Sequence, residues 1–155
     1  MIDIGGTKQL FADDELIDSM THAFQVLNPG RKHPANPLIV SDRAWEESPR
    51  LQVYGTALHA PGAQGLDRFR LWYVCRPPEY GDVVHAGLLL AQSADGIHWE
   101  KPGCGMAALN GSGDNNALWV DNSRHWVGTN GLCYDPDDAD SARRYKLLGF
   151  LGADQ

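Results

Sequence analysis

The stretch Ser93-Ala-Asp-Gly-Ile-His-Trp99 decides the fold, because it combines the residues of a tight hairpin with a tryptophan that can cover it. The pair Asp95-Gly96 offers the positive backbone angles that a two-residue hairpin turn needs. We expect Ser93 and Asp95 to hydrogen-bond the turn backbone, and Trp99 to fold its indole over the hairpin. The residues after the turn should then return antiparallel to the strand before it. The motif predicts a corner of a β-sheet and not a catalytic centre.

Strand-like segments lead into this hairpin. In residues 67–75 two sets of side chains alternate with a two-residue period, which places one set on each face of a strand: Phe69, Leu71 and Tyr73 against Arg68, Arg70 and Trp72. After a loop, residues 83–93 are apolar and of strand length, and residues 51–59 read as an earlier strand of the same unit. Together these segments predict a four-stranded antiparallel sheet.

Part of the pattern recurs downstream. Arg68-Phe-Arg-Leu71 and Arg144-Tyr-Lys-Leu147 share the order base, aromatic, base, leucine, and they lie 76 residues apart. Each opens an apolar strand. If each copy belongs to one blade of a β-propeller, the copies should lie ~40 to 50 residues apart, which is the usual length of a blade. The longer interval then implies an insertion between them, and residues 103–116 are the obvious place for it. The alternative is that two amphipathic strands resemble each other by chance.

Composition narrows the classes of protein. The chain has 155 residues, 43% of them hydrophobic, with 17 glycines and 9 prolines, which favours one globular all-β domain of short strands joined by turns. No stretch approaches the roughly 20 apolar residues that cross a bilayer, and the start Met-Ile-Asp-Ile-Gly-Gly lacks a secretion signal. We therefore expect no membrane partner and, for the chain as given, a cytoplasmic location. The net charge of −7 argues against nucleic acid as a partner.

The cysteines and histidines predict no metal site and no cofactor. Cys75, Cys104 and Cys133 are far apart and form no Cys-x-x-Cys pair. Cys75 and Cys133 lie in apolar, strand-like surroundings, where a thiol usually acts as a small buried hydrophobic group. The six histidines show no His-x-His or His-x-x-x-His spacing.

The chain divides into an N-terminal extension (residues 1–50), a complete blade (51–102), and an insertion followed by a partial second blade (103–155). Within the extension, residues 8–17 suit either an irregular strand or a helical turn. The last part contains predicted strands at 117–121, 125–134 and 143–151, with an acidic turn at 135–141.

Several motifs, in this order, resemble the amino-terminal half of proteins related to glycoside hydrolase families 32 and 43. The resemblance extends over about residues 8–151 and rests on these segments: Leu10-Phe-Ala-Asp-Asp-Glu-Leu-Ile17, Asn28-Pro29, His33-Pro-Ala-Asn-Pro37, Trp45-Glu46, Phe69-Arg-Leu-Trp-Tyr73, the 93–99 hairpin, Asn115-Asn116 and Arg144-Tyr-Lys146. The Asn-Asp-Pro-Asn-Gly and Arg-Asp-Pro motifs of family 32 are absent.

The resemblance implies a five-bladed β-propeller whose innermost strands line a sugar-binding funnel. Five blades at ~40 to 50 residues need more than 155 residues, so this all-β chain would be a partial propeller of about one and a half to two four-stranded blades. Its open strand edges invite either further C-terminal blades or self-association. In such proteins carboxylates from different blades act on the glycosidic bond, one as acid and another as base or nucleophile.

Candidate site residues follow from that chemistry. The catalytic candidates are Asp14, beside Asp13 in a short apolar stretch, and Glu46 and Asp135. Each also has a plain structural alternative, as a turn, cap or surface carboxylate. The substrate-binding candidates are residues that offer an aromatic platform or hydroxyl partners: Trp45, Asp114, Asn115, Asn116 and His125. His59 is better explained as an exposed strand-end histidine.

Two classes of function compete. The first is a glycoside hydrolase that uses these carboxylates with water as acceptor. The second is a non-catalytic carbohydrate-binding or structural propeller module. A sialidase-type propeller is a remoter alternative, which the lack of an evident arginine triad disfavours. In either case carbohydrate is the expected partner, and we expect the 155-residue chain alone to be without glycosidase activity.

Overall fold

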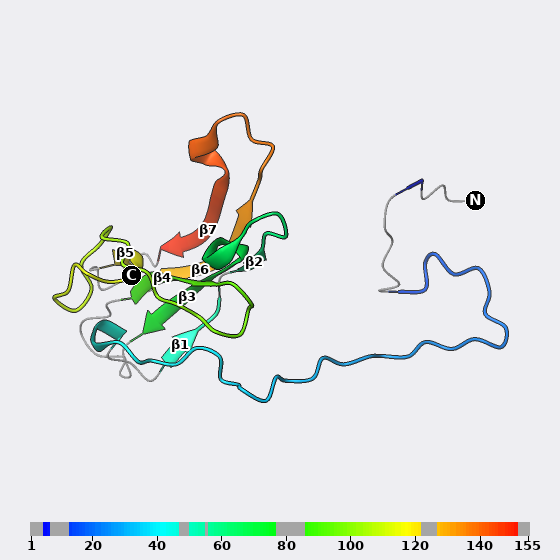
Figure 1. Ribbon diagram of the computed structural model, residues 1–155. Helices are drawn as coiled ribbons and strands as arrows, with labels where there is room; N and C mark the ends of the chain where they lie inside the picture. Colours follow the sequence, from blue (N-terminus) through cyan, green and yellow to red (C-terminus); the bar gives the residue numbers. More distant parts are fainter. Residues whose placement is uncertain are drawn as a thin grey trace. The chain divides into compact units, whose positions relative to one another are not determined.

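The computed structural model describes residues 5–6, 13–46, 50–54, 56–76, 86–121 and 127–151. The chain divides into two compact units, residues 1–33 and 34–155. All the strands of the described part belong to the second unit (Figure 1).

The larger sheet is antiparallel throughout. Its order is β1-β3-β4-β5, and β2 also pairs with β3. The five strands are β1 (Arg50–Gln52), β2 (Ala57–His59), β3 (Phe69–Arg76), β4 (Ala86–Ser93) and β5 (Ala117–Asp121). Together with the antiparallel second sheet described below, this confirms the all-β class.

Two of the strand positions in this sheet are built from separate pieces. On one side, β1 pairs with the end of β3 and β2 with its beginning. On the other side, Glu100 bridges to Gln92 and β5 pairs with the first half of β4. Glu100 and β5 thus lie side by side with the same strand, β4, and residues 101–115, here called the 101–115 excursion, leave the sheet between them. The sheet is therefore four strands wide: β1 with β2, then β3, then β4, then Glu100 with β5. The sequence analysis grouped β5 with the second blade, whereas its pairing attaches it to the first sheet.

The 93–99 hairpin has the predicted hydrogen bonds. Ser93 Oγ accepts from the backbone N–H of Gly96 at 2.9 Å, and Asp95 Oδ1 accepts from the N–H groups of Ile97 and His98, both at 2.8 Å. The indole N–H of Trp99 donates to the Gly96 carbonyl at 3.1 Å. Only the glycine of the pair adopts a positive φ, +77°. The aspartate stabilises the turn through its carboxylate instead, and the return strand is reduced to the single bridge at Glu100.

The second sheet is an antiparallel pair, β6 (Val127–Tyr134) and β7 (Tyr145–Leu151). Short 3-10 helices precede the matching strands of the two sheets: η2 (Gly65–Arg68) leads into β3, and η3 (Ser141–Arg143) leads into β7. The repeated sequences 68–71 and 144–147 thus occupy equivalent places, which supports an internal repeat over a chance likeness.

The larger sheet is buried on both faces. On one face, the core cluster contains Leu71 and Tyr73 of β3 together with Leu89 of β4, and residues of the 101–115 excursion pack on it. On the other face, Trp72 is only 4% exposed, and its ring contacts that of Tyr145 in β7 at 5.8 Å between centroids. The backbone N–H of Leu132 in β6 also donates to Thr56 Oγ1 at 3.0 Å. The β6–β7 sheet therefore packs against the larger sheet. No helix in the described ranges has the length and hydropathy needed to span a membrane.

The centre of the core gives the first testable prediction. Leu89 has no exposed surface, so we expect Leu89→Ala to lower the free energy of unfolding by about 2 to 5 kcal/mol through lost burial and a cavity. Urea denaturation followed by tryptophan fluorescence measures the change. The matched control is Leu148→Ala, because that leucine is 73% exposed and should lose little. Equal losses in the two variants would contradict the core as described.

Candidate functional site

A buried carboxylate lies at the centre of the candidate site. Glu46 ends the 3-10 helix η1 (Ala44–Glu46) and has no exposed surface. Its Oε2 accepts from Lys101 Nζ at 2.7 Å and from the backbone N–H groups of Asp42 and Arg43 at 3.1 and 3.2 Å. Its Oε1 accepts from the hydroxyl of Tyr73 at 2.7 Å. Both carboxylate oxygens are thus engaged by protein donors.

Lys101 neutralises this carboxylate from the start of the 101–115 excursion. Its side chain is 5% exposed, and besides Glu46 it donates to Asp42 Oδ1 at 2.6 Å and to the carbonyl of Val40 at 2.7 Å. The hydrogen bond from Lys101 lowers the pKa of Asp42 below its ordinary value. These contacts use all three donors of the ammonium group and attach residues 40–46 to the excursion.

An amide and an indole extend the network. Asn116 is fully buried, and its Nδ2 donates to the Tyr73 hydroxyl at 2.7 Å and to the Leu90 carbonyl at 2.8 Å. Its Oδ1 accepts from the indole N–H of Trp45 at 2.9 Å. The structure therefore brings together three candidates from distant parts of the sequence, Trp45, Glu46 and Asn116.

Two members of this network were not predicted from the sequence. Tyr73 was assigned to the strand pattern alone, yet its hydroxyl joins Glu46 to Asn116. Burial, partly offset by the hydrogen bond from Asn116, raises the pKa of Tyr73 far above its ordinary value. Lys101 does not belong to any of the motifs identified in the sequence. The only available signal was its position two residues after the hairpin motif, where an uninterrupted strand would have continued.

The neighbouring loop candidates have structural partners or face solvent. Asn115 is fully buried; its Nδ2 donates to the carbonyls of Ala107 and Ser112 at 2.9 and 2.5 Å, and its Oδ1 accepts from the N–H of Ala117 at 2.7 Å. It closes the excursion and has no surface to offer a ligand. Asp114, by contrast, is exposed.

The remaining candidates belong to other parts of the sequence. Asp14 is exposed in the first unit, where its carbonyl accepts from the N–H of Ile17 at 3.0 Å, as in a turn, and its Oδ1 accepts from Gln25 Nε2 at 3.0 Å. Asp135 begins the turn between β6 and β7 and forms an ion pair with Lys146, whose hydrogen bond lowers the pKa of Asp135. His125 lies outside the described residues.

This geometry suits a stabilising network better than acid–base chemistry. Glycoside hydrolysis needs one carboxylic acid and a second carboxylate, about 5 to 9.5 Å apart, with access to the sugar. Glu46 is inaccessible, and its neighbour Asp42 shares the same lysine. Within the described ranges, no group of three or more His, Cys, Asp or Glu side chains could hold a metal ion.

The thiols differ in their surroundings. Cys75 is buried, and its Sγ donates to the Glu46 carbonyl at 2.9 Å. Burial raises the pKa of Cys75 to about 12, which keeps this thiol protonated and unreactive at neutral pH. Cys133 is exposed, so the expectation that it is buried was wrong. It lies opposite Lys146 of β7, whose side chain is itself 42% exposed.

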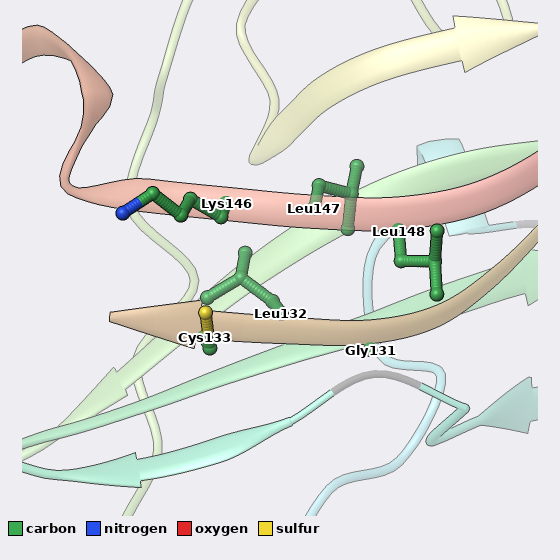
Figure 2. Close-up of a pocket in the computed structure, with 6 residues that line it drawn as sticks. All are labelled: Gly131, Leu132, Cys133, Lys146, Leu147 and Leu148. Carbon is green, nitrogen blue, oxygen red and sulfur yellow. The ribbon is translucent and has the colours of Figure 1, made fainter. Parts of the chain in front are cut away.

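A separate hollow lies on the second sheet. Three consecutive residues of each strand line a cavity of about 290 Å³, Gly131, Leu132 and Cys133 from β6 and Lys146, Leu147 and Leu148 from β7 (Figure 2). None of the sequence-predicted site residues in the described ranges lines this cavity. Its lining is mostly apolar, with the lysine ammonium held by Asp135 and Asp138 in the adjoining turn.

Comparison with known proteins adds no relative: no protein-family model, no curated protein and no solved structure matches this chain. The candidate site must therefore be interpreted from its own geometry.

Replacing the central carboxylate tests its structural role. We expect Glu46→Gln to lower the free energy of unfolding by about 3 kcal/mol, because Lys101 keeps a buried charge that has lost one of its two carboxylate partners. Chemical denaturation measures the loss, and the double variant Glu46→Gln/Lys101→Met should recover part of it. Asp135→Asn serves as the control, since its ion pair is solvent-exposed, and its loss should be much smaller. A Glu46→Gln protein as stable as this control would contradict the buried network.

The raised pKa of the Cys75 thiol predicts a loss of stability in alkali. Between its ordinary pKa of 9.0 and the folded value of about 12, the unfolded chain releases a proton that the folded chain keeps. The free energy of unfolding should therefore fall as pH rises above 9, by up to ~1.4 kcal/mol per pH unit for one proton. Cys75→Ala should have a shallower slope than the wild type in denaturation curves recorded from pH 8 to 11. Identical slopes for Cys75→Ala and the wild type would show that burial does not raise the pKa of this thiol.

Proposed function

We propose that this chain is a non-catalytic, carbohydrate-binding part of a β-propeller, in which the β1–β5 sheet forms one blade and the β6–β7 pair begins another. Three features support the proposal: the motif resemblance to sugar-active propeller proteins, the four-position antiparallel sheet closed by the 93–99 hairpin, and the repeated 3-10 helix and strand. A blade is flanked by neighbours on both faces, which agrees with the burial of Trp72 on one face and Tyr73 on the other.

The observation that carries the non-catalytic assignment is the engagement of Glu46. A general acid or nucleophile must meet the substrate, whereas this carboxylate is fully buried and bonded by the ammonium of Lys101, the hydroxyl of Tyr73 and two backbone N–H groups. The other two catalytic candidates, Asp14 and Asp135, are exposed or lysine-paired and lie in different units of the chain. Hydrolysis by the whole protein would need a carboxylate pair outside these residues.

Sugar contact is best assigned to the outer strand position formed by β1 and β2. The side of this position away from β3 pairs with no strand in the part of the chain that the structure describes. Tyr54 follows the last residue of β1 by two positions and is 47% exposed. An aromatic ring offers a flat apolar surface on which a sugar can pack.

Binding and turnover can be measured separately with the 155-residue chain. We expect it to bind members of an oligosaccharide array, to leave aryl glycosides unhydrolysed, and to lose about tenfold in affinity on Tyr54→Ala, equivalent to ~1.4 kcal/mol. The matched control is Trp119→Ala. Trp119 is 39% exposed and lies in β5, at the opposite edge of the sheet from β1. Absence of binding to every glycan would overturn the carbohydrate assignment. Turnover by the purified monomer would overturn the non-catalytic one.

A further inference from the structure

The two copies of the internal repeat differ in how their strands are paired. β3 pairs with β1 and β2 along one edge and with β4 along the other. β7 occupies the equivalent place in the second copy, after η3 as β3 follows η2. Within the described residues, however, it pairs only with β6. Among the described residues, the backbone groups on the edge of β7 that corresponds to the β4 edge of β3 therefore pair with no other strand.

Side-chain exposure follows the same difference. Leu71 and Trp72 of β3 are 8% and 4% exposed, whereas Leu147 and Leu148, which lie 76 residues later in the repeat, are 48% and 73% exposed. These neighbouring apolar residues belong to opposite faces of the strand. In β3 the equivalent residues are paired with Ala91 and Leu90 of β4. Leu147 and Leu148 thus lack the strand that covers their counterparts.

The cavity of about 290 Å³ in Figure 2 is lined by residues of both β6 and β7. Leu147 and Leu148 line it together with Leu132 and the residues on either side of it. An apolar side chain from an adjacent strand could fill this hollow. Lys146 is the only charged residue among the described residues that line the cavity, and it is already paired with Asp135 and Asp138. The hollow therefore favours an uncharged occupant.

We propose that the free edge of β7 accepts an additional antiparallel strand of the β4 type, an uncharged apolar segment supplied by polypeptide outside this chain. The repeat fixes the register: a small residue should lie opposite Leu147 and a leucine opposite Leu148, as Ala91 and Leu90 do opposite Leu71 and Trp72. An added strand forms backbone hydrogen bonds with the edge strand, and its alternate side chains can enter pockets on the sheet. The proposal does not depend on glycan binding.

A second copy of this chain is the less favoured occupant. Pairing two copies would bring together two molecules that each carry a net charge of −7, which opposes association. The β4 sequence, Ala86–Ser93, contains no charged residue. A neutral strand avoids the repulsion that a second copy would meet.

The probe is a fluorescent peptide with the sequence of residues 86–93 and lysines added at both ends for solubility. We expect fluorescence anisotropy to show saturable binding to the 155-residue chain, and hydrogen exchange to show new protection at the β7 amides. Leu148→Lys should weaken binding at least about tenfold, because a charged side chain at a strand edge blocks further pairing. Met106→Lys, a change at a 69% exposed apolar residue of the 101–115 excursion, should leave affinity unchanged.

Three results would overturn the proposal: no saturable binding, protection confined to strands other than β7, or equal affinity for the wild type and Leu148→Lys. A β7-dependent dimer that excludes the peptide, detected by light scattering, would assign the edge to a second copy instead. Thermal melting of both lysine variants checks that they remain folded. If Leu148→Lys unfolds, hydrogen exchange of the wild-type protein tests the proposal by itself: the peptide must protect the β7 amides.

Discussion

The desolvation of one carboxylate constrains most of this structure. An ionised glutamate without exposed surface is costly unless its oxygens find donors, and the donors of Glu46 come from three separate segments: the backbone of Asp42 and Arg43, the hydroxyl of Tyr73 in β3, and the ammonium of Lys101. Residues 40–46 are not part of any strand in the described ranges, so they have no ladder of backbone hydrogen bonds to hold them on the sheet. The network supplies that attachment. It also fixes the point at which the chain leaves the sheet, because Lys101 directly follows the bridge at Glu100.

The same network explains how an interrupted strand can behave as one. Glu100 and β5 share a strand position although residues 101–115 separate them, and the two ends of that excursion are held together by polar contacts. The Asn115 carbonyl accepts from the N–H of Cys104 at 2.7 Å, while the Asn116 carbonyl accepts from the N–H of Leu90 at 3.0 Å and thereby continues the pairing with β4. Asn110 Nδ2 donates to the Trp45 carbonyl at 2.7 Å, which connects the tip of the excursion to η1. The 101–115 excursion and the sheet thus hold each other in place, so a substitution that removes these hydrogen bonds should destabilise both.

Sequence reasoning succeeded where the interactions are short-range. The hydrogen bonds of the 93–99 hairpin join residues no more than three positions apart, and the alternation in β3 is a local property of that strand. It failed where long-range contacts decide. Nothing near Glu46 in the sequence indicates that Lys101, 55 positions away, neutralises it, and the strand position of β5 depends on how the excursion folds back. Residues 8–17 suited either an irregular strand or a helical turn, and the described part from Asp13 on contains a turn in which the N–H of Ile17 donates to the Asp14 carbonyl.

The candidate residues themselves show why residue type is a weak guide to ligands. Asparagine, tryptophan and glutamate suit sugar recognition because they combine donors, acceptors and flat apolar surface, yet those properties also satisfy a backbone that lies outside regular sheets. Asn115 and Asn116 use every one of their side-chain groups within the protein, as does Glu46. What separates a binding residue from a structural one here is surface that a ligand can reach. By that criterion Tyr54, which is 47% exposed and which no motif selected, is a better candidate for ligand contact than the fully buried Glu46, Asn115 and Asn116.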